Sequence, residues 1–255
     1  MPDENSDGEW RPRPGDLAAA LGFLTRFPVA GSFGRFSPDS AWAWPFIGAL
    51  LGAAAAAVVE ISLFLGMSGF LASAMALAFL VAATGALHED GLADTADGLW
   101  GGSSKDSRLK IMRDSRIGAF GVVAIGLFFL GRWSGIAELA ESNRAVAALI
   151  SACAVSRAAM AAAMHLVPPA RTDGLSASVG RPGRGSIICG IAAAAAVSAA
   201  CVGWVSIPLI VVAGAAVAPV CWLALKRIGG QTGDVLGAAQ QCAEIAALVF
   251  LAAAL

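Results

Sequence analysis

The 255-residue sequence has few charged residues, no tyrosine and no clustered cysteines. Charged residues make up 14% of the chain and hydrophobic residues 58%, whereas soluble domains are about one quarter charged and about half apolar. The net charge of −1 argues against the basic surface that binds nucleic acid. The five cysteines stand singly in apolar stretches, which argues against a zinc site or a disulfide framework. The composition indicates a membrane protein without a nucleic-acid partner.

Long apolar stretches separated by short polar segments predict an all-α, polytopic membrane helical bundle. A spanning helix needs about 20 mostly apolar residues, and about seven stretches qualify: 44–65, 70–87, 118–132, 146–167, 187–205, 208–225 and 235–255. Residues 1–15 are polar and proline-rich and lack the apolar stretch of a signal peptide, so we expect a disordered cytoplasmic tail. Residues 16–255 then form a single membrane-embedded catalytic domain. Its first segment, 16–29, is too short to span and predicts an interfacial helix.

Lysine and arginine are unevenly distributed between the segments that link the predicted spans. With the N-terminus inside, the outer segments carry only Arg132 and Arg144, and the inner segments carry most of the others. Cytoplasmic loops are enriched in Lys and Arg. We therefore expect the N-terminus in the cytoplasm and the chain in a bacterial inner membrane. The polar segments 88–116, 168–186 and 226–234 then lie together on the cytoplasmic side.

Three aspartates directly after the second predicted span form the strongest chemical signal. Asp90, Asp94 and Asp97 fall on one face of a helix, because their spacing is i, i+4 and i+7. Such carboxylates repel one another unless a cation lies between them, and their hard oxygen ligands suit Mg²⁺. The flanking Gly91 and Gly98 would let a ligand approach the backbone. The alternative is a solvated acidic loop at the membrane surface.

Basic and acidic residues alternate just before the third predicted span. Arg113 and Arg116 are candidates for binding phosphate oxygens. Asp114 between them is a candidate metal ligand or base. The alternative is that these charges only anchor the loop on the cytoplasmic side, which would need the charges but not their order.

A glycine-rich segment, residues 229–234, lies between the last two predicted spans. Its glycines could form a turn whose backbone N–H groups bind an anion, with Thr232 and Asp234 touching substrate or metal. The alternative is a tight glycine turn in which Asp234 caps the next helix.

Two ionisable residues, Arg157 and Glu244, stand inside predicted spans. Charges in lipid are costly and face a partner or a cavity, so these two either pair with each other or line a polar substrate cavity. Glu89 points away from the aspartate face and is not assigned to the metal. His88 lies beside the aspartates on the far side of their helix, where it could orient a ligand or accept a proton.

Taken together, the motifs resemble the adenosylcobinamide-GDP ribazoletransferase family, also called cobalamin-5′-phosphate synthase. They occur in order over about residues 20 to 250. The matching segments are Leu24-Thr-Arg26-Phe-Pro28, Pro45-Phe-Ile-Gly48, the aspartate segment from His88 to Gly98, Ile111-Met-Arg-Asp114-Ser-Arg116, Ser156-Arg157, Gly229-Gly-Gln-Thr-Gly-Asp234 and Leu236-Gly-Ala238. The family pattern has two acids in the last helix, whereas this chain has Gln241 and then Glu244, which argues against metal binding by that helix.

The resemblance implies a Mg²⁺-dependent membrane transferase of cobalamin biosynthesis. Its substrates would be adenosylcobinamide-GDP and α-ribazole or α-ribazole 5′-phosphate, and GMP would be released. A diphosphate needs a cation and arginines to neutralise it, and the attacking hydroxyl needs a base. We assign metal binding to Asp90, Asp94 and Asp97, catalysis to Asp97, Asp114 and Arg116, and substrate binding to Arg26, Arg113, Arg157, Thr232 and Asp234.

Two other functions were weighed against this one. CDP-alcohol phosphotransferases also place aspartates at the membrane face, but their D-x₂-D-G-x₂-A-R pattern is absent, since three residues separate Asp90 from Asp94. A transporter would place its carboxylates near the membrane midplane, whereas the aspartates here lie at a predicted membrane boundary.

A monomer and a homo-oligomer both fit the sequence. Both α-ribazole and α-ribazole 5′-phosphate also fit it as the acceptor.

Overall fold

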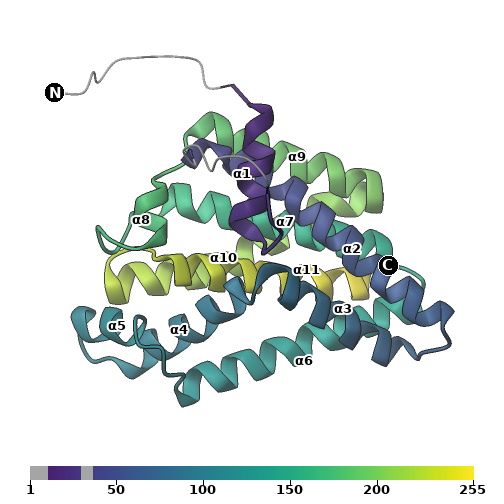
Figure 1. The fold of residues 1–255 in the computed structure, drawn as a ribbon, viewed down its shortest axis with the longest axis horizontal. Helices are drawn as coiled ribbons and strands as arrows, with labels where there is room; N and C mark the ends of the chain where they lie inside the picture. The colour runs from purple at the N-terminus through teal and green to yellow at the C-terminus, as the bar shows by residue number, and fades with distance from the viewer. Residues whose placement is uncertain (1–10, 30–36) are drawn as a thin grey trace.

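The computed structural model describes residues 11–29 and 37–255, and these residues form helices connected by short loops (Figure 1). Within this part of the chain there is no β-strand, and an isolated bridge joins Pro169 to Gln231. The elements in chain order are α1 (Pro14–Leu24), η1 (Pro38–Ala43), α2 (Trp44–Phe64), α3 (Gly69–Thr84), α4 (Leu87–Gly101), α5 (Lys105–Ile111), α6 (Ala119–Glu141), α7 (Ala145–Leu166), α8 (Leu175–Val179), α9 (Arg184–Val202), η2 (Gly203–Val205), α10 (Ser206–Ile228) and α11 (Gly233–Ala254).

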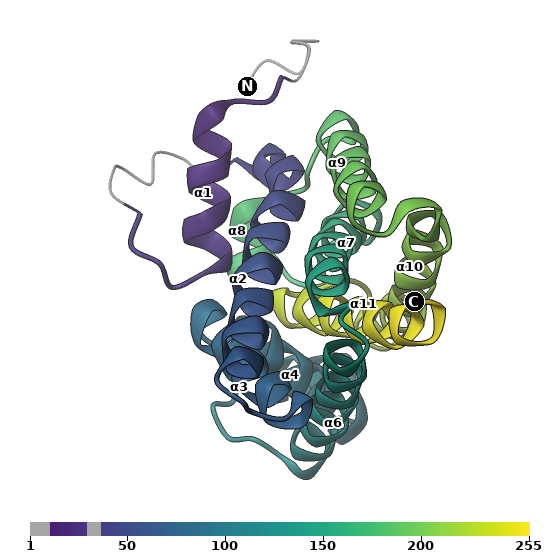
Figure 2. The ribbon, with the colours of Figure 1, turned by 90° about the vertical axis from the view of Figure 1, so that its right-hand side faces the viewer.

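The helices α7 and α11 form the centre of the molecule. Helix α7 packs against α2, α9, α10 and α11, and Figure 2 shows it with these neighbours around it. Helix α11 in turn packs against α4, α6 and α10. The outer helices expose large apolar side chains, for example Phe64, Leu127, Trp204 and Ile207. The expected all-α, polytopic membrane protein is confirmed, because apolar outward faces on long helices require lipid.

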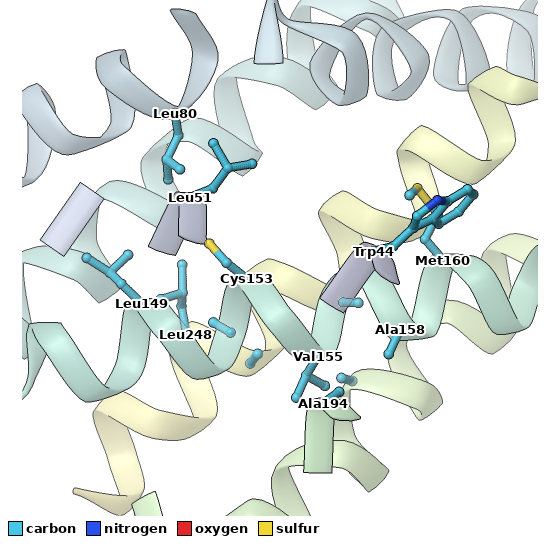
Figure 3. Packing of buried hydrophobic residues seen from close by; sticks show 14 of the residues in the cluster. Trp44, Leu51, Leu80, Leu149, Cys153, Val155, Ala158, Met160, Ala194 and Leu248 are labelled. Atoms are coloured by element: carbon cyan, nitrogen blue, oxygen red, sulfur yellow. The ribbon is translucent and has the colours of Figure 1, made fainter. Parts of the chain in front are cut away.

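Close approach of α2 to α7 depends on glycine. A Cβ added to Gly48 or Gly52 would lie less than 3.0 Å from the carbonyl oxygens of Cys153 or Leu149. Figure 3 shows this region, where Leu51 lies beside Leu149 and Cys153. Small residues at helix interfaces are the usual means of packing in lipid, where burial of apolar surface gives little driving force between helices.

The predicted number of seven spans is not confirmed. By length and composition, five helical stretches can cross a membrane, or six if α3 and α4 together form one broken span. One of the five is the stretch Arg184–Ile228, which η2 divides into α9 and α10. Helix α3 has only 16 residues, and the chain then bends by 86° into α4. No proline marks this bend, and Gly85, a residue type that commonly ends a helix, was the available signal.

Two boundaries differ from the sequence-based expectations. Helix α6 extends to Glu141 rather than ending at residue 132, so Arg132 is a buried residue within a helix and not part of an outer loop. At the N-terminal end, α1 starts at Pro14, inside the segment expected to be a tail. Residues 1–10 of that tail lie outside the described residues.

Candidate active site

Helix α4 presents the aspartates because the chain turns sharply before it. Gly85 and Ala86 both adopt left-handed backbone conformations, with φ of 64° and 57°. Glycine tolerates this conformation, whereas it costs alanine about 1–2 kcal/mol. The turn sets α4 at 86° to α3. The predicted helical spacing of Asp90, Asp94 and Asp97 is therefore real, since all three lie on α4.

A pocket of about 120 Å³ lies between α1, α2, α4, α7 and α11. Its charged lining residues are Asp90, Arg171 and Asp234. The apolar lining comes from other elements and includes Phe23 and Trp44, whose stacked rings have centroids 5.6 Å apart. A concave site that joins apolar walls to a few convergent charged groups is typical of small-molecule binding.

Helix α4 approaches the first turn of α11 closely at Gly91. A Cβ on Gly91 would lie 2.8 Å from the carbonyl oxygen of Asp234. Gly98 instead faces the side chain of Met112 and the backbone of Arg108. Both glycines thus serve packing between protein segments, and not the approach of a ligand expected from the sequence. The packing at Gly91 brings Asp234 close to α4, where it interacts electrostatically with Asp94.

The Asp94 carboxylate lies at the centre of a group of negative charges. It interacts electrostatically with Asp90, Asp97 and Asp234, and with the Arg171 guanidinium. Within the part of the chain that the structure describes, no three His, Cys, Asp or Glu side chains are arranged ready to hold a metal ion. The grouping therefore concentrates negative charge without a finished coordination shell.

Asp97 is engaged in a different task from its two neighbours. Its carboxylate accepts hydrogen bonds from the backbone N–H of Gly118 at 2.7 Å and of Gly121 at 2.9 Å. These groups belong to the start of α6, where N–H groups lack helical partners and negative charge is stabilising. Asp97 is buried and therefore caps α6, and both of its oxygens are occupied there.

The basic segment after α5 lies at the surface. Arg116 donates hydrogen bonds to Asp114 at 2.7 and 3.0 Å, and this pairing lowers the pKa of Asp114 to about 2. A carboxylate with so low a pKa is a weak proton acceptor near neutral pH. Neither Asp114 nor Arg116 lines the pocket. Arg113 instead donates to both oxygens of Asp173, at 2.5 and 2.6 Å.

The glycine-rich segment closes the pocket from the side of α11. Gly229 ends α10 in a left-handed conformation, and Gly230 lies against the carbonyl of Pro168. The side chain of Thr232, rather than that of Asp234, caps α11 by accepting a hydrogen bond from Val235. Thr232 also donates to Asp234 at 3.1 Å. The turn and the cap are thus both present, and Asp234 is left to face the pocket.

Arg171 is a site residue that the sequence reasoning missed. Its guanidinium lies 3.7 Å from the Asp234 carboxylate and 3.9 Å from that of Asp173. Two backbone hydrogen bonds of 2.8 Å hold the loop that carries it to the glycine-rich segment. The N–H of Ala170 donates to the carbonyl of Gln231, and the N–H of Gln231 donates to the carbonyl of Pro168. The available signal for Arg171 was the predicted position of segment 168–186 on the same side of the membrane as the aspartates.

Arg26 lies at the α3–α4 corner. Its backbone N–H donates to the carbonyl of Ala83 at 2.8 Å, and its exposed side chain lies over Gly85. It does not line the pocket, although Leu24, two residues earlier, does.

A buried network of charges lies behind the aspartate face. Arg132 forms ion pairs with Glu89 at 2.7 Å and with Glu244 at 2.6 Å, and Glu244 also pairs with Arg157. All four side chains are at most 8% exposed. Gln241 accepts from Arg132 and donates to Glu89. Of the two readings of Arg157, the described contacts favour the internal pair.

The chain was compared with known proteins. The family model described as cobalamin-5-phosphate synthase matches residues 16–252. A protein of Bradyrhizobium diazoefficiens named adenosylcobinamide-GDP ribazoletransferase is 46% identical over 247 residues, covering 93% of each chain. A protein of the same name from Mesorhizobium japonicum is 43% identical, and the match covers 94% of this chain and 93% of the relative. Another from Allorhizobium ampelinum is 41% identical, and the match covers 94% of this chain and 97% of the relative. No solved structure matches the chain.

The match covers every element from α1 to α11, including the aspartate helix, the glycine-rich segment and the loop with Arg171. The shared name of these relatives indicates a transferase. The chain belongs to the cobalamin-5-phosphate synthase family.

Proposed function

We propose that the protein joins α-ribazole, or its 5′-phosphate, to adenosylcobinamide-GDP and releases GMP. The relatives' name supports this reaction. The observation that carries the proposal is a pocket lined both by the charged residues Asp90, Asp234 and Arg171 and by apolar aromatic side chains. A diphosphate donor and a nucleoside-like acceptor need both kinds of surface.

The carboxylates fit a magnesium ion by their chemistry. Asp90, Asp94 and Asp234 offer hard oxygen ligands, and their mutual repulsion favours a divalent cation between them. We leave Asp97 out of this set because each of its oxygens already accepts a hydrogen bond from the start of α6. When bound, Mg²⁺ would neutralise charge on the diphosphate.

The chain's own residues would hold the substrates and move a proton. Arg171 would bind phosphate oxygens, since a guanidinium suits their geometry, and the Phe23–Trp44 pair would contact the flat base of the acceptor. A hydroxyl oxygen on the ribose ring, which is free both in α-ribazole and in its 5′-phosphate, bonds to the phosphorus on the cobinamide side. The bond from that phosphorus to the bridging oxygen breaks, and GMP leaves with the electron pair. We assign the departing hydroxyl proton to Asp90, because Asp90 lines the pocket and Asp114 lies outside it.

The reaction can be tested with purified protein in detergent, adenosylcobinamide-GDP and α-ribazole. We expect GMP release that stops when EDTA removes divalent ions and returns with added Mg²⁺. Asp94→Asn should lower the rate at least about 100-fold, since preorganised charge at such sites contributes 10²–10³-fold. Asp106→Asn is the matched control, because Asp106 is an exposed acid of α5 outside the pocket. Full activity of Asp94→Asn, or activity that persists in EDTA, would contradict the proposal.

We also infer that the pocket opens to the cytoplasm of a bacterial inner membrane. This orientation rests on the seven-span assignment of Lys and Arg, from which Arg132 is now removed as an outer charge because it is buried within α6. A cysteine introduced at exposed Asp106 should react with an impermeant maleimide in inverted vesicles only. Labelling of intact cells would contradict this orientation.

A further inference from the structure

A second cavity lies on the opposite side of α4 from the aspartates. It is a groove of about 500 Å³ whose floor and walls come from α4, α6, α10 and α11, which lie together at the end of the molecule near α5 (Figure 1). Among the residues that the structure describes, no charged side chain lines it. On α4 it uses Leu92, Ala96 and Leu99, which project away from Asp90 and Asp94 at helical spacing. It is therefore separate from the candidate active site.

The groove opens between helices whose outer faces meet the membrane. Phe120, Val123 and Leu127 of α6 line it and are more than half exposed. The same is true of Trp100 on α4 and Trp222 on α10. Helices α6 and α10 both belong to stretches that can span the membrane. An apolar groove of this size, open toward lipid, suits an acyl chain.

The tryptophan end of the groove carries positive charge. Lys226 Nζ lies 5.0 Å from the ring centroid of Trp222, and Arg227 Cζ lies 5.3 Å from that of Trp100. Lys105 is adjacent, with its Nζ near Gly229. Within the described residues, none of these three cations forms an ion pair with a carboxylate. Unpaired cations beside tryptophans at a membrane boundary attract anionic headgroups.

We propose that this groove binds an anionic phospholipid, with an acyl chain between α6 and α10 and the headgroup phosphate at Lys226 and Arg227. Arg227 is held in place, because it donates to the carbonyl of Leu99. Lys226 is exposed and free to meet the phosphate. Charge complementarity selects an anionic lipid over a zwitterionic one.

The test is lipid retention by the purified full-length protein, measured by native mass spectrometry with equal amounts of phosphatidylglycerol and phosphatidylcholine. We expect one phosphatidylglycerol retained with at least tenfold preference. Lys226→Gln should reduce the preference to below threefold, whereas Arg144→Gln, an exposed cation beyond the other end of α6, should not change it. Equal retention of the two lipids by the unaltered protein would overturn the proposal, and so would equal loss in both variants.

A second pair of variants tests the groove itself. Ala124→Phe would fill it from α6, and we expect the retained lipid to be lost. Val211→Phe on α10 is the control, because Val211 is exposed and does not line the groove. Ala96→Leu fills the same space from α4 and replaces Ala124→Phe if that variant does not fold. Retention by the filled variants, or a lipid-free dimer that buries the groove, would overturn the proposal.

Discussion

Replacing Glu244 with alanine should destabilise the protein strongly, because Glu244 neutralises two buried arginines. Its carboxylate pairs with Arg132 at 2.6 Å and with Arg157, and both partners are 2% exposed. The network of Glu89, Arg132, Arg157 and Glu244 contains two charges of each sign, so Glu244→Ala leaves one uncompensated positive charge. Removing one partner of a buried pair costs about 3–5 kcal/mol. At about 2–4 °C per kcal/mol for a chain of this size, the unfolding midpoint should fall by about 6–20 °C.

The assay is thermal unfolding in detergent, followed by circular dichroism at the helical band. Glu60→Ala is the control, since Glu60 is an exposed acid on α2, and it should change stability by less than about 0.5 kcal/mol. The double variant Glu244→Ala/Arg157→Met restores charge balance with an apolar side chain. It should recover at least about 2 kcal/mol relative to Glu244→Ala, because an apolar replacement of a buried pair is often tolerated. The reasoning is refuted if Glu244→Ala unfolds like Glu60→Ala, or if the double variant is additive.

Three further predictions follow from other contacts. Gly52→Ala should lower the free energy of unfolding by about 1–3 kcal/mol, because the added Cβ would overlap the α7 backbone. Gly126→Ala is the control and should not lower it, because there is open space at Gly126. Equal unfolding midpoints of the two variants would contradict this. Asp97→Asn should cost about 0.5–2 kcal/mol as a weakened helix cap, and its Mg²⁺ dependence of GMP release should match that of the unaltered protein; a large increase in the Mg²⁺ requirement would make it a metal ligand instead. Arg116→Gln should raise the pKa of Asp114 from about 2 toward its usual 3.8, as followed by ¹³C NMR of labelled aspartate. Because the pKa of Asp114 is lowered in the folded protein, the stabilisation of the fold by the Asp114–Arg116 pair is present above about pH 4 and is lost as the pH falls through about 2. An unchanged Asp114 titration in Arg116→Gln would contradict the pairing.

The sequence predicted the features that depend on composition and local spacing. Apolar length indicated the membrane helices, and the i, i+4, i+7 pattern indicated the aspartate helix. The pairing of Arg157 with Glu244 could also be named, because a lone charge in lipid needs a partner.

The remaining features depend on tertiary structure. The α3–α4 corner requires a left-handed Ala86, which no sequence rule for alanine signals. Asp97 caps α6 across a loop, so its helical spacing suggested a metal ligand although its partners are backbone groups. Arg132 was assigned to an outer loop because the predicted span ended at that residue. Arg171 was missed because its loop meets the glycine-rich segment only in the folded chain.

The position of Asp234 at the start of the final helix has a consequence for biogenesis. Its carboxylate joins those of α4 only after α11 has docked against α4 and α6. During synthesis the earlier helices enter the bilayer while the chain still lacks one wall of its pocket. If the proposed site is correct, we expect a nascent or truncated chain without the C-terminal helix to be inactive.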